Sequence, residues 1–211
     1  VAGGGEVPFL GAKLYPIFSP DGEAKPQHII NSTLETLFED YCKFVSRLRS
    51  DSTFFVDKMP SNFLWVGLIR EFFPNAKIVN IQREPMAVIW SNYKHFFSSK
   101  ELSFTNDLKD ILSYYRAYVD LMKFWNSYNE SEIYTVNYEQ LTEQPKEEIS
   151  KLLKYCKLEW EDSCVDFYKK DSLVKTASRD QVKQPIYRGS SSEWKKYHEY
   201  LAPIARKAKS L

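Results

Sequence analysis

The sequence predicts an α/β protein built on parallel strands, and three observations in the stretch from Phe54 to Phe97 carry this prediction. Short runs of β-branched and aromatic residues alternate with segments that repeat apolar residues at helical spacing. Prolines stand where the helices would begin, because the first turn of a helix needs no N–H from that residue. The connections are short, and a strand–helix–strand–helix order with short connections is typical of parallel packing.

The stretch divides into two strands and two helices. FFVD at 54–57 is the first predicted strand, and Pro60 opens a helix. KIVNIQ at 77–82 is the second strand, and Pro85 opens another helix. The apolar positions at helical spacing are Leu64, Leu68 and Phe72 in the first helix and Val88, Ile89 and Tyr93 in the second.

The segments before this stretch differ in pattern. Residues 8–27 hold four prolines and no clear period, so we expect a long loop there. Such a loop could be a lid or substrate wall, or equally a flexible surface loop. Residues 28–49 repeat apolar side chains at helical spacing and predict an amphipathic helix.

After the stretch, the pattern predicts one more strand among several helices. Thr105 is expected to cap the longest of these helices. The predicted elements are a helix over 107–128, the strand IYTVN at 133–137, a helix from Pro145, a helical piece over 160–169 and a helix from Trp194 to about residue 208.

The composition limits the classes of partner. The 211 residues include 29 basic and 28 acidic side chains, so no global field recruits nucleic acid or an anionic membrane. We expect one domain over residues 1–211. The three cysteines are odd in number and match no zinc spacing, the longest apolar runs are too short to span a bilayer, and no leader pattern is present. These features predict a cytoplasmic location.

Polar residues follow both strands of the organising stretch. Asp57 and Lys58 follow the first strand, Arg83 and Glu84 follow the second, and Ser91 comes one helical stretch later. In parallel sheets, ligands gather at the carboxyl ends of the strands and at the helix N-termini beyond them. A cation at each strand end therefore suits an anionic ligand.

Three motifs in this order resemble the sulfotransferase family, specifically the branch of protein-tyrosine sulfotransferases and their bacterial relatives. The motifs are DKMPSNF with LIREFFPNAKIVNIQREPMAVIWSNY, then VNYEQL, then TASRDQVKQPIY followed by a tryptophan. They run from Lys58 to Trp194. The resemblance implies a P-loop-NTPase-like three-layer fold with a central parallel sheet flanked by helices. It also implies sulfuryl transfer from 3′-phosphoadenosine 5′-phosphosulfate to a hydroxyl or amine, without a metal.

The resemblance also implies catalytic roles for three residues. Sulfuryl transfer is like phosphoryl transfer, an in-line displacement helped by positioning and by charge placed where charge develops. Lys58 would stabilise the bridging oxygen of the leaving phosphate, with Ser178 beside it. Glu6, in the turn GGGEV, would take the proton of the acceptor as the general base. The alternatives are a solvated lysine at a strand end and a solvated loop carboxylate.

The nucleotide site implied by the resemblance centres on the 3′-phosphate. Arg83 and Ser91 match the pair that grips this phosphate, and a guanidinium fork suits phosphate oxygens. The alternative for Arg83 is an ordinary surface ion pair. The other positions that the resemblance assigns to the nucleotide are Tyr138, which could equally be a core tyrosine, the loop residues Gln181, Val182 and Pro185, and the further donors Arg188, Ser190 and Lys195.

The sequence departs from the family pattern at two positions in this region. Glu193 stands where the tyrosine-sulfating enzymes carry a lysine, and His95 stands where they carry an arginine. We expect Lys94, Arg188 or Lys195 to compensate for the lost positive charge.

A larger departure is the absence of the family's RSGTT-type loop, which cradles the 5′-phosphosulfate through backbone N–H groups. The run Gly3-Gly4-Gly5 lacks the GK[ST] ending of a phosphate loop. The chain opens on Val1, so we expect a fragment or a processed form that lacks the family's first strand and helix. We therefore expect these 211 residues to bind the nucleotide poorly and to transfer sulfate slowly or not at all.

Two other classes of function remain open at this point. A metal-dependent nucleotide enzyme such as a kinase would need acidic ligands, for which Asp57 is a candidate. A non-catalytic interaction domain with a decayed nucleotide site is the other. The expected partners are the nucleotide and an acceptor of unknown type, with no nucleic acid and no membrane, and a homodimer is a possible assembly.

Overall fold

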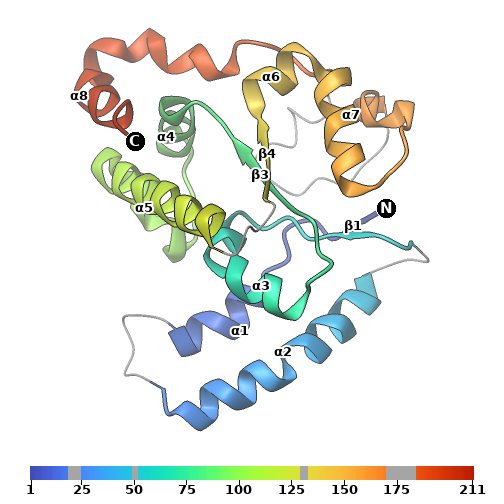
Figure 1. Ribbon diagram of the computed structural model, residues 1–211. Coiled ribbons are helices and arrows are strands. Elements are labelled where there is room, and N and C mark those ends of the chain that lie inside the picture. The colour runs from blue at the N-terminus through green and yellow to red at the C-terminus, as the bar shows by residue number, and fades with distance from the viewer. Residues whose placement is uncertain (19–24, 49–51, 129–132, 170–183) are drawn as a thin grey trace. The chain divides into compact units, whose positions relative to one another are not determined.

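The computed structural model describes residues 1–18, 25–48, 52–128, 133–169 and 184–211 (Figure 1). These residues form two compact units, Val1–Ala76 and Lys77–Leu211, called here the N-terminal and the C-terminal unit. Each unit combines helices with one pair of parallel strands. The predicted α/β class with parallel strands is therefore confirmed, whereas the prediction of a single domain stays a prediction.

The N-terminal unit consists mainly of helices packed on one another. In chain order its elements are β1 (Ala2–Gly3), α1 (Phe9–Phe18), α2 (Gln27–Leu48), β2 (Phe55–Val56), the 3₁₀ helix η1 (Pro60–Trp65) and α3 (Val66–Phe72). The predicted helix over 28–49 thus agrees with α2 to within one residue at each end. The helix predicted from Pro60 begins there as a 3₁₀ helix and becomes an α-helix at Val66.

The prediction of a loop over residues 8–27 is wrong for the part that forms α1. Leu10 and Leu14, one helical turn apart, are both buried against Leu37 of α2 and Trp65 of η1. This burial stabilises a helix that carries Pro16 in its interior, where proline costs a backbone hydrogen bond. The prolines in the sequence therefore led to a loop prediction for a helix that is stabilised by tertiary packing.

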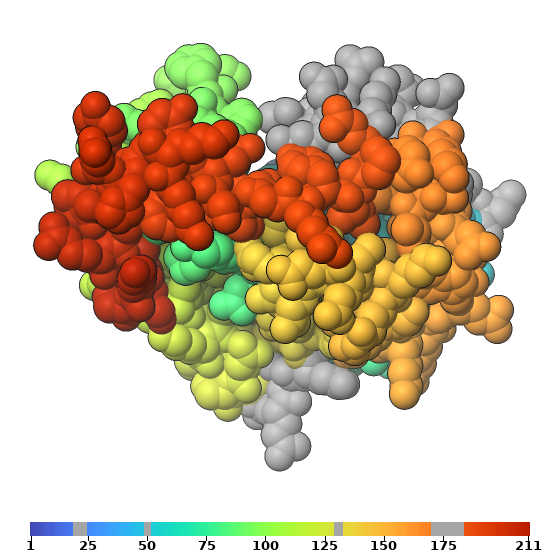
Figure 2. Space-filling model, turned by 90° about the horizontal axis from the view of Figure 1, so that it is seen from above, coloured from blue at the N-terminus to red at the C-terminus, as the bar shows by residue number. Residues whose placement is uncertain are grey.

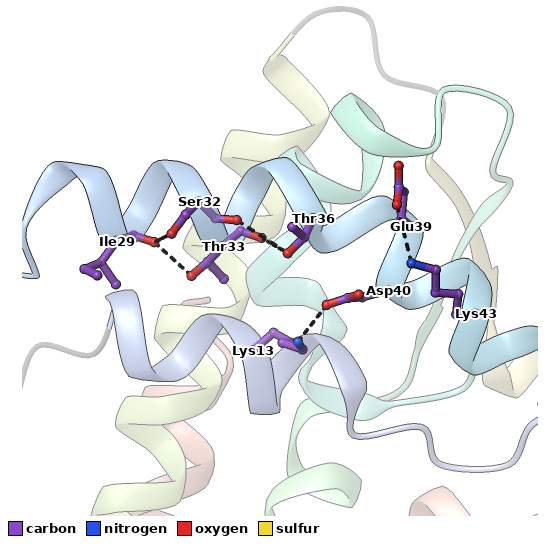
Figure 3. A network of polar contacts seen from close by, with 8 residues as sticks. All are labelled: Lys13, Ile29, Ser32, Thr33, Thr36, Glu39, Asp40 and Lys43. Carbon is purple, nitrogen blue, oxygen red and sulfur yellow. Dashed lines mark hydrogen bonds and ion pairs between the residues drawn. The ribbon is translucent and has the colours of Figure 1, made fainter.

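The Lys13–Asp40 ion pair ties α1 to α2, and further polar contacts lie within α2 (Figure 3). Lys13 Nζ of α1 donates to Asp40 Oδ2 of α2 at 2.9 Å. Within α2, the hydroxyls of Ser32 and Thr33 both donate to the carbonyl of Ile29, at 3.1 and 2.9 Å. Both hydroxyl groups thus find a hydrogen-bond acceptor within their own helix, as is common for Ser and Thr side chains in helices.

The C-terminal unit carries the longer strand pair. In chain order its elements are β3 (Ile78–Gln82), α4 (Pro85–Lys94), the 3₁₀ helix η2 (Lys100–Asn106), α5 (Leu108–Ser127), β4 (Ile133–Asn137), α6 (Tyr138–Glu143), α7 (Pro145–Cys156), the 3₁₀ turns η3 (Asp162–Cys164), η4 (Phe167–Lys169) and η5 (Ser190–Tyr197), and α8 (His198–Ala208). Strands β3 and β4 run parallel in a register that pairs Ile78 with Ile133 and Gln82 with Asn137. Their carboxyl ends therefore lie at the same edge.

The core of the C-terminal unit lies among α4, α5, η5 and α8. Ile89 of α4 is fully buried, and Ile111 of α5, Trp194 of η5 and Leu201 of α8 pack into the same cluster. This packing fixes α4, which follows β3 closely, against η5, which begins only at Ser190. Figure 2 shows the resulting face, where residues from 184 onward (orange to red) lie against the yellow residues that follow β4.

Three predicted details in the C-terminal unit differ from the structure. Asp107, not Thr105, caps α5, because its carboxylate accepts the backbone N–H groups of Lys109 and Asp110. Thr105 is buried and donates its hydroxyl to the carbonyl of Leu102 within η2. The helical piece over 160–169 is two separate 3₁₀ turns, and the final helix begins as a 3₁₀ helix ahead of Trp194.

Among the described residues, no helix is both long enough and apolar enough to cross a bilayer.

Candidate functional site

Parallel pairing of β1 with β2 brings the two predicted catalytic side chains of the N-terminal unit together. Phe55 and Val56 of β2 pair with Ala2 and Gly3, and the backbone N–H of Lys58 donates to the carbonyl of Gly5 at 3.2 Å. Backbone hydrogen bonding between the two segments thus continues beyond the strands, to Gly5 on one side and Lys58 on the other. The Lys58 ammonium and the Glu6 carboxylate form an ion pair.

The glycine run before Glu6 has a structural reason in this turn. A Cβ at Gly4 would lie 2.4 Å from the ring of Phe55. Gly5 has a φ of 67°, in the left-handed region that side chains disfavour. Both glycines allow the close turn that presents Glu6 to Lys58.

The Lys58–Glu6 pair is accessible to a ligand. The two side chains are 55% and 44% exposed, and exposed ion pairs of this kind contribute roughly 0–1 kcal/mol to stability. Either group can therefore leave its partner at little cost. Together they offer one cation and one carboxylate, which are the groups needed to stabilise a leaving anion and to accept a proton.

Asp57, the neighbour of Lys58, is held by hydrogen bonds to residues of α2 and η1. Its carboxylate accepts the hydroxyl of Tyr41 at 3.0 Å and the amide of Asn62 at 3.4 Å. Burial raises the pKa of Asp57, against the two hydrogen bonds, and the pKa of Tyr41 is raised by its own burial and by Asp57. Asp57 therefore links β2 to α2 and η1. Within the described residues, no group of three or more His, Cys, Asp or Glu side chains is placed to hold a metal ion.

A polar hollow in the C-terminal unit gathers the residues predicted to hold the 3′-phosphate. It is lined by Arg83, Ala87, Trp90, Ser91, Lys94, Tyr138, Tyr187, Ser190 and Glu193. Its volume of about 40 Å³ is far below the roughly 300 Å³ of a typical small-molecule pocket. The hollow thus suits a single group such as one phosphate, not a whole nucleotide.

The strand register explains why Arg83 and Tyr138 meet in the polar hollow. Each is the first residue after a strand, and the last residues of β3 and β4, Gln82 and Asn137, are paired. The Arg83 guanidinium stacks over the Tyr138 ring, 4.7 Å from its centroid. The Tyr138 hydroxyl lies 3.1 Å from the hydroxyl of Ser190.

Arg83 is oriented by a chain of hydrogen bonds that sequence reasoning missed. Its Nε donates to Ser191 Oγ at 3.0 Å, and the Ser191 hydroxyl donates to Glu139 Oε1 at 2.5 Å. The same carboxylate oxygen accepts the backbone N–H of Glu84 at 3.1 Å. Glu139 therefore joins three segments of the chain. Within the described part of the chain, Arg83 makes this hydrogen bond through Nε.

The backbone around Ser190 and Ser191 depends on one glycine. Gly189, which precedes η5, has a φ of 93°, and a side chain there would be strained. Ser190 was predicted as a further phosphate donor, whereas the sequence signal for Ser191 and Glu139 was limited to their places, close after a glycine and directly after Tyr138. Their partners lie 52 or more residues away, and no local pattern reveals such contacts.

The two positions that depart from the family pattern also lie at this site. The Glu193 carboxylate accepts a hydrogen bond from Lys94 Nζ at 2.8 Å, and the pair forms an ion pair on the wall of the hollow. Lys94 lowers the pKa of Glu193. His95 lies next to the hollow, with its Nδ1 2.7 Å from the carbonyl of Ser91.

Other predicted nucleotide residues do not line the polar hollow. Arg188 donates through Nη2 to the carbonyl of Glu143, the last residue of α6, at 2.8 Å. Lys195 and Pro185 are exposed. Of the three cations expected to compensate for Glu193 and His95, Lys94 alone is among the lining residues. Ser178, Gln181 and Val182 lie outside the described residues.

A second cavity lies between α1 and α2 of the N-terminal unit. Its volume is about 440 Å³, and Lys13, Ile29, Ser32, Thr33 and Thr36, all drawn in Figure 3, are among its lining residues. The lining includes neither Glu6 nor Lys58.

Known proteins resemble both the sequence and the structure. The sequence is 39% identical over 173 residues to an uncharacterized protein of Aquifex aeolicus (strain VF5). The matched region covers 81% of this chain and 23% of that relative. The chain thus spans about a quarter of the length of this relative.

Two solved structures share the fold. The sulfotransferase domain from the Synechococcus PCC 7002 olefin synthase gives a TM-score of 0.59 at 17% identity, over 88% of this chain and 67% of that chain. The sulfotransferase domain from the curacin biosynthetic pathway gives a TM-score of 0.57 at 15% identity, over 88% and 71%. The predicted P-loop-like fold is therefore confirmed. The sequence model of the sulfotransferase family matches residues 11–162, well over half of the chain, and the chain therefore belongs to the sulfotransferase family.

Proposed function

We propose that this chain binds 3′-phosphoadenosine 5′-phosphosulfate and transfers its sulfuryl group to an acceptor that carries a hydroxyl or an amine. The observation that carries the proposal is the polar hollow, where Arg83, Ser91 and Tyr138 meet at the carboxyl ends of two parallel strands. The 3′-phosphate of the donor would bind there. The Nη donors of Arg83, the hydroxyls of Ser91 and Ser190, and the ammonium of Lys94 match phosphate oxygens in charge and in hydrogen-bonding capacity.

The Lys58–Glu6 pair of the N-terminal unit supports the chemical step. When the donor is bound, its phosphosulfate supplies the sulfuryl group. The acceptor oxygen or nitrogen forms a bond to sulfur as the bond from sulfur to the phosphate oxygen breaks, and adenosine 3′,5′-bisphosphate leaves. Lys58 stabilises the negative charge that develops on that phosphate oxygen, and Glu6 accepts the proton of the acceptor. Both groups are solvent-exposed, so both can change partners during the reaction.

The residues assigned by resemblance alone complete the proposal. Ser178 would donate to the bridging oxygen, and Gln181, Val182 and Pro185 would lie against the adenosine. Arg188 and Lys195 would act from outside the hollow, where Arg188 would first release the carbonyl of Glu143.

Transfer of labelled sulfate tests the proposal directly. We expect the chain, incubated with ³⁵S-labelled donor and a panel of phenols, sugars and amines, to give a labelled product and to do so equally well in EDTA. Because residues 1–211 contain no RSGTT-type loop, we expect slow turnover, measured over hours. Binding of the donor without any product would favour the non-catalytic alternative, and magnesium-dependent transfer of phosphate from a nucleoside triphosphate, with no labelled sulfate product, would favour a kinase-like enzyme.

A further inference from the structure

Glu193 places a negative charge on the wall of the polar hollow, where the other charged lining residues that the structure describes are cations. The hollow is lined by the cations Arg83 and Lys94, and Glu193 is the carboxylate among its lining residues. Lys94 Nζ and Glu193 Oε2 are 2.8 Å apart, with side chains 34% and 44% exposed. Of the two cations that line the hollow in the described part of the chain, one is therefore already paired with a group of the protein.

The charge of Glu193 acts on the whole hollow. Its pKa is lowered first by Lys94, and further by Lys196 and Arg83, so the carboxylate is ionised at neutral pH. The attraction is mutual, and Arg83 therefore also lies within the field of this carboxylate. An anion that enters must either break the Lys94–Glu193 pair or bind beside a like charge, and both cost free energy.

We propose that Glu193 is a built-in counter-anion that competes with the 3′-phosphate for Lys94 and so weakens nucleotide binding. The inference rests on the proposed function and adds a specificity-determining residue to it. The donor and the product adenosine 3′,5′-bisphosphate carry the same 3′-phosphate, so Glu193 weakens the binding of both. Its effect on the product is to speed release.

The test is a calorimetric titration of the E193Q variant with adenosine 3′,5′-bisphosphate and with adenosine 5′-monophosphate. Glutamine has the same shape and removes only the charge, and its amide oxygen still accepts from Lys94. We expect E193Q to bind the bisphosphate roughly tenfold more tightly than the wild type. The reason is that the Glu193 carboxylate and a 3′-phosphate in the same hollow repel each other strongly when both are partly shielded from water. The monophosphate, which has no 3′-phosphate, should bind both proteins with the same affinity within about twofold.

The matched control is E147Q, which removes the same charge from an exposed ion pair with Lys151 on α7. It should leave both affinities unchanged. Unchanged or weaker bisphosphate binding by E193Q, in a protein that melts at the wild-type temperature, would overturn the inference. An E193A variant that also binds more tightly would support it, because alanine removes the charge without offering a hydrogen bond. If the wild type prefers the bisphosphate but E193Q does not change that preference, the counter-anion role fails and the proposed function stands. If neither protein distinguishes the two nucleotides, both fail.

Discussion

An Arg83→Ala variant should bind adenosine 3′,5′-bisphosphate about a hundredfold more weakly than the wild-type chain. Arg83 stacks on Tyr138 and is oriented through Nε by Ser191, and in the proposed complex its Nη groups would donate to the phosphate. Hydrogen bonds to charged groups contribute about 1.5–3 kcal/mol each, and a forked guanidinium can make two of them. Calorimetric titration with the bisphosphate and with adenosine 5′-monophosphate measures this loss.

Two further variants show whether the loss comes from the 3′-phosphate contact. Arg83→Lys keeps the charge but not the fork or the stacking, so we expect it to recover only part of the affinity. Arg116→Ala removes an exposed arginine of α5 and should bind as the wild type does. An equal loss of affinity for the monophosphate, which has no 3′-phosphate, would show that Arg83 does not act on that group.

A Lys58→Ala variant should transfer sulfate about a hundredfold to a thousandfold more slowly at saturating donor, with little change in donor affinity. Removing one preorganised group that stabilises developing charge typically costs this much in rate. Loss of the exposed ion pair with Glu6 costs at most about 1 kcal/mol of stability, so unfolding does not explain such a decrease. Single-turnover transfer of labelled sulfate separates the rate of the chemical step from binding.

The control for this variant is Lys43→Ala, which breaks the exposed Lys43–Glu39 ion pair of α2 in the same unit. Its transfer rate should equal that of the wild type. A Lys58→Ala rate within threefold of the wild type would contradict the role of Lys58 at the leaving phosphate, and the solvated-lysine alternative would then be the better description.

The sequence was most informative where local pattern and structure coincide. The β-branched runs at 77–82 and 133–137 predicted the two strands. The place of Arg83 directly after the first of them predicted it as a site residue. The resemblance added Ser91 and Tyr138, and all three line one hollow. Periodicity and capping act within a few residues, so the α-helix from Pro85 was also predictable.

What the sequence could not predict depends on contacts between distant residues. Helix α1 forms despite its interior Pro16 because Leu10 and Leu14 are buried against Leu37. The carboxylate of Glu139 reaches Ser191, 52 residues away, and through it Arg83. Glu193 was recognised as a departure from the family pattern, but its pairing with Lys94 on the wall of the hollow is a feature of the folded chain.

The central claim is that the polar hollow of the C-terminal unit binds the 3′-phosphate of the donor nucleotide. A heteronuclear NMR titration of the 211-residue chain with adenosine 3′,5′-bisphosphate tests it most directly. We predict that the largest shifts occur at the side-chain Nε–H of Arg83 and at the backbone amides of Ser91 and Ser190, and that adenosine 5′-monophosphate causes much smaller shifts there. Shifts confined to other residues, or equal shifts with both nucleotides, would contradict the claim.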